Sequence, residues 1–286
     1  MRWNVGRRRL LRVSRQPQGV DSVFTHRIPS GIVASHPKTG RTWLRFMLAH
    51  YLGQYFGSSN TEPLNMHNMY DFVPNYETDA HGRGLRRASV RRDVPLIAMD
   101  HSRPRLYQHK SIPVVLLIRD PRDVAVSHWH HAKWHYANTD APNSLSEFVS
   151  DAWANNFFEH FESWMRFRRT QYSRLMITSY EAMYTDTVDQ LTAIVQHMAI
   201  AVSPELIRRA VHASEFSTMQ AIELRYGIRG IQYDRTNRNA RRVRSGTIGS
   251  HHRHLDSFAA ARIASAAERI LSHESKVVLA RLTNYS

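Results

Sequence analysis

The amino-acid sequence predicts an α/β fold in which helices cover both faces of a doubly wound parallel sheet. Three short apolar runs, at residues 31–34, 95–99 and 113–118, have the length and composition of buried parallel strands, and residues 175–178 form a fourth candidate. Longer segments with helical periodicity lie between and after these runs. Because strands that alternate with helices are typical of a parallel sheet covered on both faces, this order of segments indicates the fold class.

The expected helices are the stretches in which apolar residues recur at helical spacing. They are residues 42–56, 122–131, 144–169, 187–198, 204–213 and 257–271. Asp186 and Ser203 are suited to N-cap two of these helices, and Pro204 suits a first helical position. Residues 57–94 and 224–254 hold Gly, Pro, Asn and Arg and have little periodicity. We expect these two segments to be long loops, which in a compact domain are usually functional or disordered.

The length and composition are typical of one large α/β domain. The chain has 286 residues, of which 42% are hydrophobic, and this is enough for a sizeable core. We expect a single domain over residues 27–286, preceded by a basic arm over residues 1–26 that is expected to be mobile. The arm is rich in arginine and poor in acids, as a solvated surface segment or a presequence is, but it lacks the apolar core of a secretory signal.

Cysteine content and hydropathy exclude several classes of protein. The chain contains no cysteine, which excludes disulfides, thiolate metal sites and a cysteine nucleophile. It contains no run of 18 apolar residues, so we expect no membrane span. An intracellular, cytoplasmic protein is the simplest interpretation of both observations.

The net charge of +15 favours anionic partners. Two segments concentrate arginine without any acid, at residues 2–15 and 235–253. Nucleotides, sulfated or phosphorylated substrates, nucleic acid and acidic membrane surfaces all carry the complementary charge. Charge by itself does not separate these partners, and a run of arginines is also typical of a solvated surface.

A polar turn after the first predicted strand has the residues of an anion site. It contains Lys38, Thr39, Gly40, Arg41 and Thr42, and a predicted helix follows. The start of a helix offers free N–H groups and a positive dipole end to an anion, and glycine lets the backbone approach it closely. An ordinary turn with a surface lysine explains the same residues equally well.

Comparison with the Walker A loop makes this turn P-loop-like but not a standard NTPase loop. When Gly40 and Thr42 are aligned with the end of G-x-x-x-x-G-K-[ST], Ser35 stands at the first glycine and Arg41 at the lysine. Two defining positions therefore differ, and the lysine has moved ahead of the glycine as Lys38.

A second candidate phosphate site follows the third predicted strand. The segment from Arg119 to Ser127 reads Arg-Asp-Pro-Arg-Asp-Val-Ala-Val-Ser, with Pro121 suited to a first helical turn. The guanidinium fork of Arg119 and the hydroxyl of Ser127, one to two turns along that helix, are able to hold a phosphate together. The alternative is a local Arg–Asp network that stabilises the start of the helix.

These two motifs, in this order, resemble those of sulfotransferases that use 3′-phosphoadenosine 5′-phosphosulfate (PAPS). The turn resembles the family's Pro-Lys-Ser-Gly-Thr-Thr-Trp loop for the 5′-phosphosulfate, and the Arg-Asp-Pro-Arg-Asp-x-x-x-Ser segment resembles its 3′-phosphate motif. The resemblance implies that the turn residues bind the phosphosulfate and that Trp43 flanks the base. It also implies that Arg119 and Ser127 bind the 3′-phosphate.

Three weaker matches complete the resemblance on the donor side. Arg244, Ser245 and Gly246 resemble the family's Arg-Lys-Gly-x-x-Gly segment, with a serine in place of the lysine. Tyr180 matches a tyrosine at the end of a later strand. Ser214 and Phe216 match a Thr-Ser-Phe-x-x-Met segment near adenine. For Trp43 and Phe216 a place in the core explains the residue type equally well.

The resemblance implies His101 as the catalytic base. His101 follows the second predicted strand and stands at the histidine of the family's Lys-Thr-His segment, whose lysine is replaced here by Met99. Histidine has a free pKa near neutrality, as a base requires. The expected reaction is in-line sulfuryl transfer from PAPS to a hydroxyl, with Lys38 and His101 catalytic, 3′-phosphoadenosine 5′-phosphate (PAP) as product and no metal.

Two rival functions and the acceptor stay open at the level of sequence. Asp100 after an apolar strand resembles a Walker B carboxylate of a nucleotide kinase or other phosphotransferase, and the +15 charge suits a nucleic-acid-binding protein, although no nucleic-acid partner is expected. No oligomeric state is predicted. The acceptor is expected to be a hydroxyl-bearing small molecule, lipid or carbohydrate. Its pocket is expected in residues 60–93, 128–145 and 224–240, which include Tyr70, Phe72, Tyr76, Trp129, Trp134, Tyr136 and Tyr226.

Overall fold

The structure is a computed structural model that describes residues 29–57, 62–76, 85, 93–104, 111–135 and 142–285. The predicted basic arm over residues 1–26 and the predicted acceptor residue Tyr136 lie outside the described residues. The division of the chain into an arm and one domain stays a prediction.

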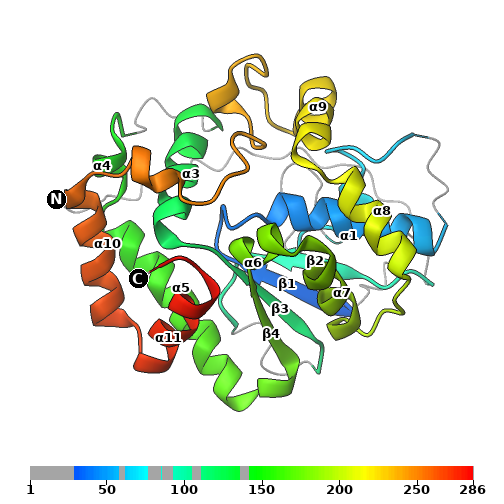
Figure 1. Ribbon diagram of the computed structural model, residues 1–286, viewed down its shortest axis with the longest axis horizontal. Helices are drawn as coiled ribbons and strands as arrows, with labels where there is room; N and C mark the ends of the chain where they lie inside the picture. The colour runs from blue at the N-terminus through cyan, green and yellow to red at the C-terminus, as the bar shows by residue number, and fades with distance from the viewer. Residues whose placement is uncertain are drawn as a thin grey trace, which may run out of the picture.

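Four parallel strands form the sheet, as the sequence predicts (Figure 1). The spatial order is β2-β1-β3-β4. The strands are β1 (Gly31–Ser35), β2 (Ile97–Asp100), β3 (Val114–Ile118) and β4 (Leu175–Ser179). Successive crossovers place β2 on one side of β1 and β3 on the other, so the chain leaves the sheet in opposite directions after β1 and β3. In open α/β sheets ligands bind at such a switch point, beyond the carboxyl ends of the strands.

Strands β1, β2 and β3 are fully buried because both faces of the sheet are covered. Val115 and Leu117 of β3 pack into one apolar cluster, and Val114, Leu116 and Ile118 pack into the other. This alternation explains why the strands are continuous apolar runs without a polar face.

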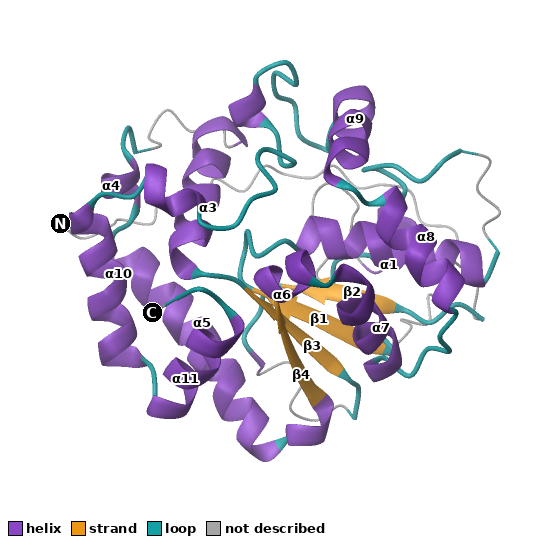
Figure 2. Ribbon diagram, viewed as in Figure 1, coloured by secondary structure: helices purple, strands orange, loops and turns teal. Residues whose placement is uncertain are grey.

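Helices form a layer on each side of the sheet (Figure 2). On one side lie α1 (Arg41–Tyr55), the short α2 (Met69–Phe72), α7 (Thr187–His197) and α8 (Pro204–Ala213). On the other lie α3 (Pro121–His135), α5 (Asp151–Thr170), α10 (Ser257–Ile270) and α11 (His273–Leu282). The predicted N-caps are confirmed, since Asp186 accepts from the N–H of Asp189 and Ser203 from that of Leu206.

The prediction of one helix over residues 144–169 is wrong. The segment forms two helices, α4 (Leu145–Phe148) and α5, because Ser150 leaves the helical conformation and its side chain accepts from the N–H of Trp153. Ser144 caps α4 in the same way. The apolar periodicity continues across this break, so Ser150 is the one residue that marks the break in the sequence.

The structure adds helices that the periodicity did not indicate. These are α2, α6 (Tyr180–Thr185), α9 (Phe216–Tyr226), α11 and three 3₁₀ turns at Tyr172–Arg174, Arg238–Ala240 and Ser250–Arg253. Within the long segment 57–94, residues 74–76 extend the sheet, because Met99 of β2 donates its N–H to Pro74 and accepts the N–H of Tyr76. This places the described part of the segment beside the carboxyl end of β2.

Candidate active site

One cavity of about 620 Å³ lies beyond the carboxyl ends of the strands and gathers nearly all of the predicted site residues. Its lining includes Lys38, Gly40, Arg41, Thr42, Trp43, His101, Arg119, Ser127, Tyr180, Ser214, Phe216, Arg244, Ser245 and Gly246. These residues come from six separate parts of the chain. Their convergence in one cavity is a tertiary result that no single motif implies.

Thr39 is the one predicted site residue that does not line the cavity. Its side chain is 1% exposed, and its hydroxyl donates to the carbonyl of His36 at 3.1 Å. The hydroxyl therefore stabilises the turn from within, and the expectation that it faces a ligand does not match its position.

The turn before α1 has the backbone of an anion site. Lys38 and Gly40 both adopt left-handed conformations, with φ of 75° and 100°. A β-carbon at Gly40 would lie 2.6 Å from Cδ2 of Tyr180, so glycine is required there. No side chain caps the start of this 15-residue helix, so the N–H groups of its first residues, Arg41 and Thr42, which line the cavity, are offered to an anion.

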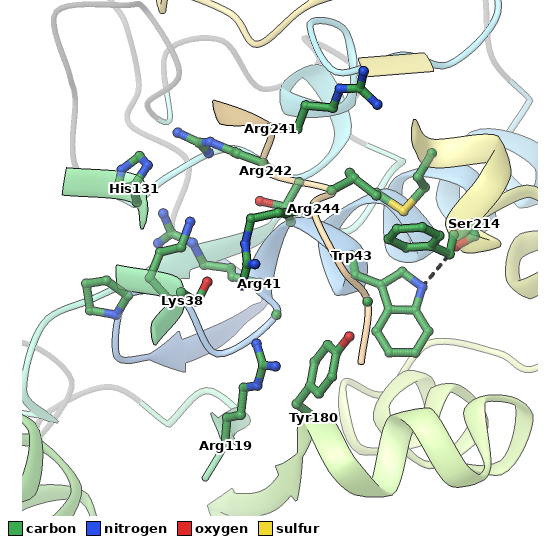
Figure 3. Close-up of a pocket in the computed structure, with 18 of the residues that line it drawn as sticks. Lys38, Arg41, Trp43, Arg119, His131, Tyr180, Ser214, Arg241, Arg242 and Arg244 are labelled. Carbon is green, nitrogen blue, oxygen red and sulfur yellow. Dashed lines mark hydrogen bonds between the residues drawn. The ribbon is translucent and has the colours of Figure 1, made fainter. Parts of the chain in front are cut away.

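Aromatic and guanidinium groups form one end of the cavity (Figure 3). The guanidinium of Arg119 lies 4.1 Å from the ring centroid of Tyr180 and donates to the carbonyl of Thr247 at 3.0 Å. The indole N–H of Trp43 donates to the carbonyl of Ser214 at 3.0 Å, and its ring meets that of Tyr180 edge-on. Trp43 is half-buried and Phe216 is 40% exposed, so neither is simply a core residue.

The Arg–Asp network that the sequence offered as an alternative is also present. Arg122 pairs with Asp120 at 2.8 Å, and Arg119 lies 3.5 Å from Asp123. Asp123, however, does more than stabilise the helix start. Its carboxylate accepts hydrogen bonds from Gly249, Ser250 and His251, in the second long loop of the sequence.

Two buried carboxylates hold that loop over the cavity. Asp123 on α3 binds the loop at residues 249–251, after Gly246 in the sequence. Glu223 on α9 binds it before Arg244, where it accepts from the N–H groups of Arg242 and Val243 at 2.8 and 2.7 Å. Glu223 also accepts from the hydroxyl of Tyr233. The segment that carries Arg244 and Gly246 is therefore fixed between two anchors. Glu223 is not among the predicted site residues, because its only signal in the sequence is an acid with apolar neighbours, Ile222 and Leu224.

Gly246 is shaped by its contact with Phe216. Its φ is +61°, and a β-carbon there would lie 2.4 Å from Cδ2 of Phe216. Glycine thus lets the loop lie against the aromatic ring and bring Arg244 to the cavity.

His101 has the tautomer of a proton acceptor. Its Nδ1 lies 2.7 Å from the carbonyl oxygen of Ser35, and since a carbonyl only accepts, Nδ1 carries the proton. The lone pair is then on Nε2. Burial and the nearby charge of Arg41 lower the pKa of His101 well below its usual value, so the ring is neutral.

Lys38 lies in the cavity among other positively charged side chains. Burial together with the charges of Arg242, Arg119 and Arg244, partly offset by Glu223, lowers its pKa to about 7. An anion in the cavity reverses this effect, because opposite charge favours the protonated amine.

The wall expected to hold an aromatic acceptor is formed largely by histidines. Of the predicted aromatic residues that the structure describes, only Tyr70 lines the cavity. His130, His131 and His135 of α3 line it instead, while Trp134 points outward and is 38% exposed. Burial lowers the pKa of all three histidines, so they are neutral hydrogen-bonding groups.

Asp100 is occupied by its own turn. Its Oδ1 accepts from the N–H groups of His101 and Ser102 and from the Ser102 hydroxyl.

Within the described ranges no cluster of three or more His, Asp or Glu side chains has the arrangement of a metal site. No helix in the described part of the chain is long and apolar enough to span a bilayer.

Known proteins share this sequence pattern and fold. The sulfotransferase domain model matches residues 29–274. Sulfotransferase 1E1 of Mus musculus is 22% identical over 69% of this chain and 68% of its own, and the 3-beta-hydroxysteroid sulfotransferase of Cavia porcellus is 25% identical over 78% and 77%. The crystal structure of retinol dehydratase in complex with androsterone and inactive cofactor PAP matches with a TM-score of 0.62 and 18% identity, over 88% of this chain and 83% of that one. The predicted fold class is confirmed.

Replacing Gly246 with alanine is expected to weaken PAP binding about tenfold, because the added methyl group would displace Phe216 and the loop that carries Arg244. Isothermal titration calorimetry measures this. Gly57→Ala is the matched control, since Gly57 also has a positive φ, of 71°, but its β-carbon would meet nothing within 4 Å. Equal affinities for the two variants would show that the Gly246 segment does not contact the nucleotide.

PAP affinity is expected to fall as the pH rises above 7, because the anion requires protonated Lys38 and the pKa of that amine in the free protein is about 7. Below pH 7 the amine is already charged, so the affinity levels off there. Compared with Lys38→Arg, which stays charged throughout, wild type should lose about tenfold in affinity between pH 6 and pH 8. The phosphate groups of PAP titrate equally with wild type and with Lys38→Arg, so their effect cancels when the two pH profiles are compared. Parallel pH profiles would refute this role for Lys38.

Proposed function

The chain belongs to the sulfotransferase domain family, and we propose that its cavity transfers a sulfuryl group from PAPS to a hydroxyl acceptor. One observation carries the proposal: Lys38, Arg119 and Arg244, from three distant segments, line the same cavity as the neutral histidine His101. The first three match the family's two phosphate sites, and the fourth matches its base.

The cavity fits the charge and size of this donor. Its volume of about 620 Å³ is typical of a small-molecule site. The turn at Lys38 and the helix start after it offer a site for the phosphosulfate. Arg119, Ser127 and Arg244 offer one for the 3′-phosphate. Trp43, Tyr180 and Phe216, which line the same cavity, supply rings for the base.

The transfer needs a proton acceptor and a means of stabilising the leaving group. His101 takes the acceptor's proton on Nε2 while the hydroxyl oxygen forms a bond to sulfur. The bond between sulfur and the bridging oxygen breaks, and PAP leaves with the negative charge. Lys38 and the first N–H groups of α1 stabilise that charge from fixed positions, as in other preorganised electrostatic sites.

The serine and methionine that replace family lysines lie in the cavity. Ser245 and Met99 both line it, and neither supplies charge. Lys38 therefore carries more of the stabilisation at the transferring group.

We propose that the acceptor is a hydroxyl-bearing small molecule and that the protein acts in the cytoplasm. Two similar proteins are named for such an acceptor and such a compartment: the 3-beta-hydroxysteroid sulfotransferase of Cavia porcellus and cytosolic sulfotransferase 17 of Arabidopsis thaliana. Lipid and carbohydrate acceptors belong to the same proposal.

Turnover with PAPS and a panel of phenols, steroid alcohols and sugars tests the function. Sulfated product, detected by mass spectrometry without added magnesium, is expected for at least one acceptor. Magnesium-dependent ATP turnover in the absence of PAPS-dependent product would favour the phosphotransferase alternative. Salt-sensitive duplex binding without either activity would favour a nucleic-acid-binding protein.

His101→Ala is expected to lower kcat about 10²–10⁴-fold while PAP affinity stays near that of wild type, because the lost group moves a proton and does not hold the donor. His252→Ala, at an exposed histidine that does not line the cavity, is the control. Turnover of His101→Ala near the wild-type rate would exclude this histidine as the base.

A further inference from the structure

The cavity holds more positive charge than the proposed donor site uses. Six cationic side chains line it: Lys38, Arg41, Arg119, Arg241, Arg242 and Arg244. The described acids of the lining are Asp100 and Glu215. Asp100 accepts from its own turn, and Glu215 pairs with His212 at 2.7 Å. The proposed donor site accounts for the side chains of Lys38, Arg119 and Arg244. Three arginines remain.

Arg241 is satisfied by the loop itself. Its Nε and Nη2 donate to the carbonyls of Arg235 and Thr236 at 2.8 and 3.3 Å. In Figure 3 its side chain points away from Lys38. The surplus charge that faces the cavity is therefore that of Arg41 and Arg242.

Arg41 and Arg242 lack an anionic partner within the described part of the chain. Neither guanidinium takes part in an ion pair or a hydrogen bond there, and Nε of Arg242 is fully buried without a partner. Burial, with the charges of Arg45 and Arg242, lowers the pKa of Arg41. Arginine nevertheless stays protonated in proteins, so each side chain remains a partly desolvated charge.

Both arginines are held in place by the fold. Arg41 is the first residue of α1, directly after Gly40. The backbone of Arg242 is fixed by its N–H, which donates to the buried carboxylate of Glu223 at 2.8 Å. A cation that is fixed and unpaired in a cavity is arranged to meet an anion from outside the chain.

The two arginines lie near the base, Lys38 and the histidines of α3. The charge of Arg41 acts on His101 and is itself influenced by Tyr70 and Asp100, so it lies beside the base. The charge of Arg242 acts on Lys38, His131 and His135. In Figure 3 Arg242 and His131 lie on one side of Lys38, and Arg119 and Tyr180 lie on the other.

We propose that Arg41 and Arg242 bind an oxyanion of the acceptor itself, so that this enzyme sulfates molecules that already carry a carboxylate, phosphate ester or sulfate ester. The proposal rests on the proposed function and specifies its substrate class. The acceptor's hydroxyl reaches His101, and its anionic group lies between the two guanidinium forks. The neutral histidines His131 and His135 offer further hydrogen bonds to such a polar acceptor.

Matched acceptors test this directly. The probes are 4-hydroxyphenylacetate with its methyl ester, and glucose 6-phosphate with glucose, each titrated into the full chain saturated with PAP. Binding in this dead-end complex is read by calorimetry, independently of turnover. At least one anionic probe is expected to bind about tenfold more tightly than its neutral partner, as hydrogen bonds to charged groups allow.

Arg242→Gln is expected to remove about tenfold of that preference and to leave the KM for PAPS within a few-fold of wild type. Arg238→Gln is the matched control. It removes the same charge from an exposed position on the same loop, does not line the cavity, and should keep the preference. Thermal unfolding of both variants reports whether the loop stays folded.

Two results would overturn the proposal. One is equal or tighter binding of both neutral probes by wild type. The other is a rise in the KM for PAPS in Arg242→Gln with the anionic preference intact, which would assign Arg242 to the donor. Failure of the sulfotransferase function has a different signature, since wild type would then neither bind PAP nor sulfate any acceptor.

Discussion

The mutual repulsion of cations at the carboxyl ends of the strands is the constraint on which this structure depends. Lys38, Arg119, Arg242 and Arg244 come from the first turn, the third strand and the late loop, and the fold holds them around one cavity. Their crowding and burial bring the pKa of Lys38 to about 7. Such an arrangement raises the free energy of the empty protein and is relieved by anionic ligands, namely the two phosphate groups of the nucleotide and, at Arg242, the proposed oxyanion of the acceptor.

Buried carboxylates make this arrangement possible without neutralising it. Asp123 and Glu223 use their oxygens mainly on backbone N–H groups of the late loop. They therefore fix where the loop lies and leave its arginines facing the cavity. The same loop needs Gly246 to pass beside Phe216. Position and charge are thus supplied by different residues, so the site is rigid before any ligand arrives.

The proposed role of His101 as base likewise depends on neighbouring residues, which set its tautomer and its charge. The carbonyl of Ser35, at the end of β1, fixes the proton of His101 on Nδ1 and leaves Nε2 as the acceptor. Burial and Arg41 keep the ring neutral. Histidine was suggested as the base from its place after a strand. Its tautomer comes from a strand that is adjacent in space and 66 residues away in sequence.

The sequence by itself determined the fold class, the four strands and the turn and strand-end motifs that line the cavity, because apolar runs and a glycine turn act locally on the backbone. It failed where distant contacts decide. The anchors Asp123 and Glu223 and the histidine wall depend on which segments meet, whereas the break at Ser150 and the engagement of Thr39 within its turn are local hydrogen bonds that apolar periodicity does not reveal. Only the tertiary structure shows that Arg41 and Arg242 remain without a partner in the described chain, because a charge is paired or unpaired only through its neighbours in space.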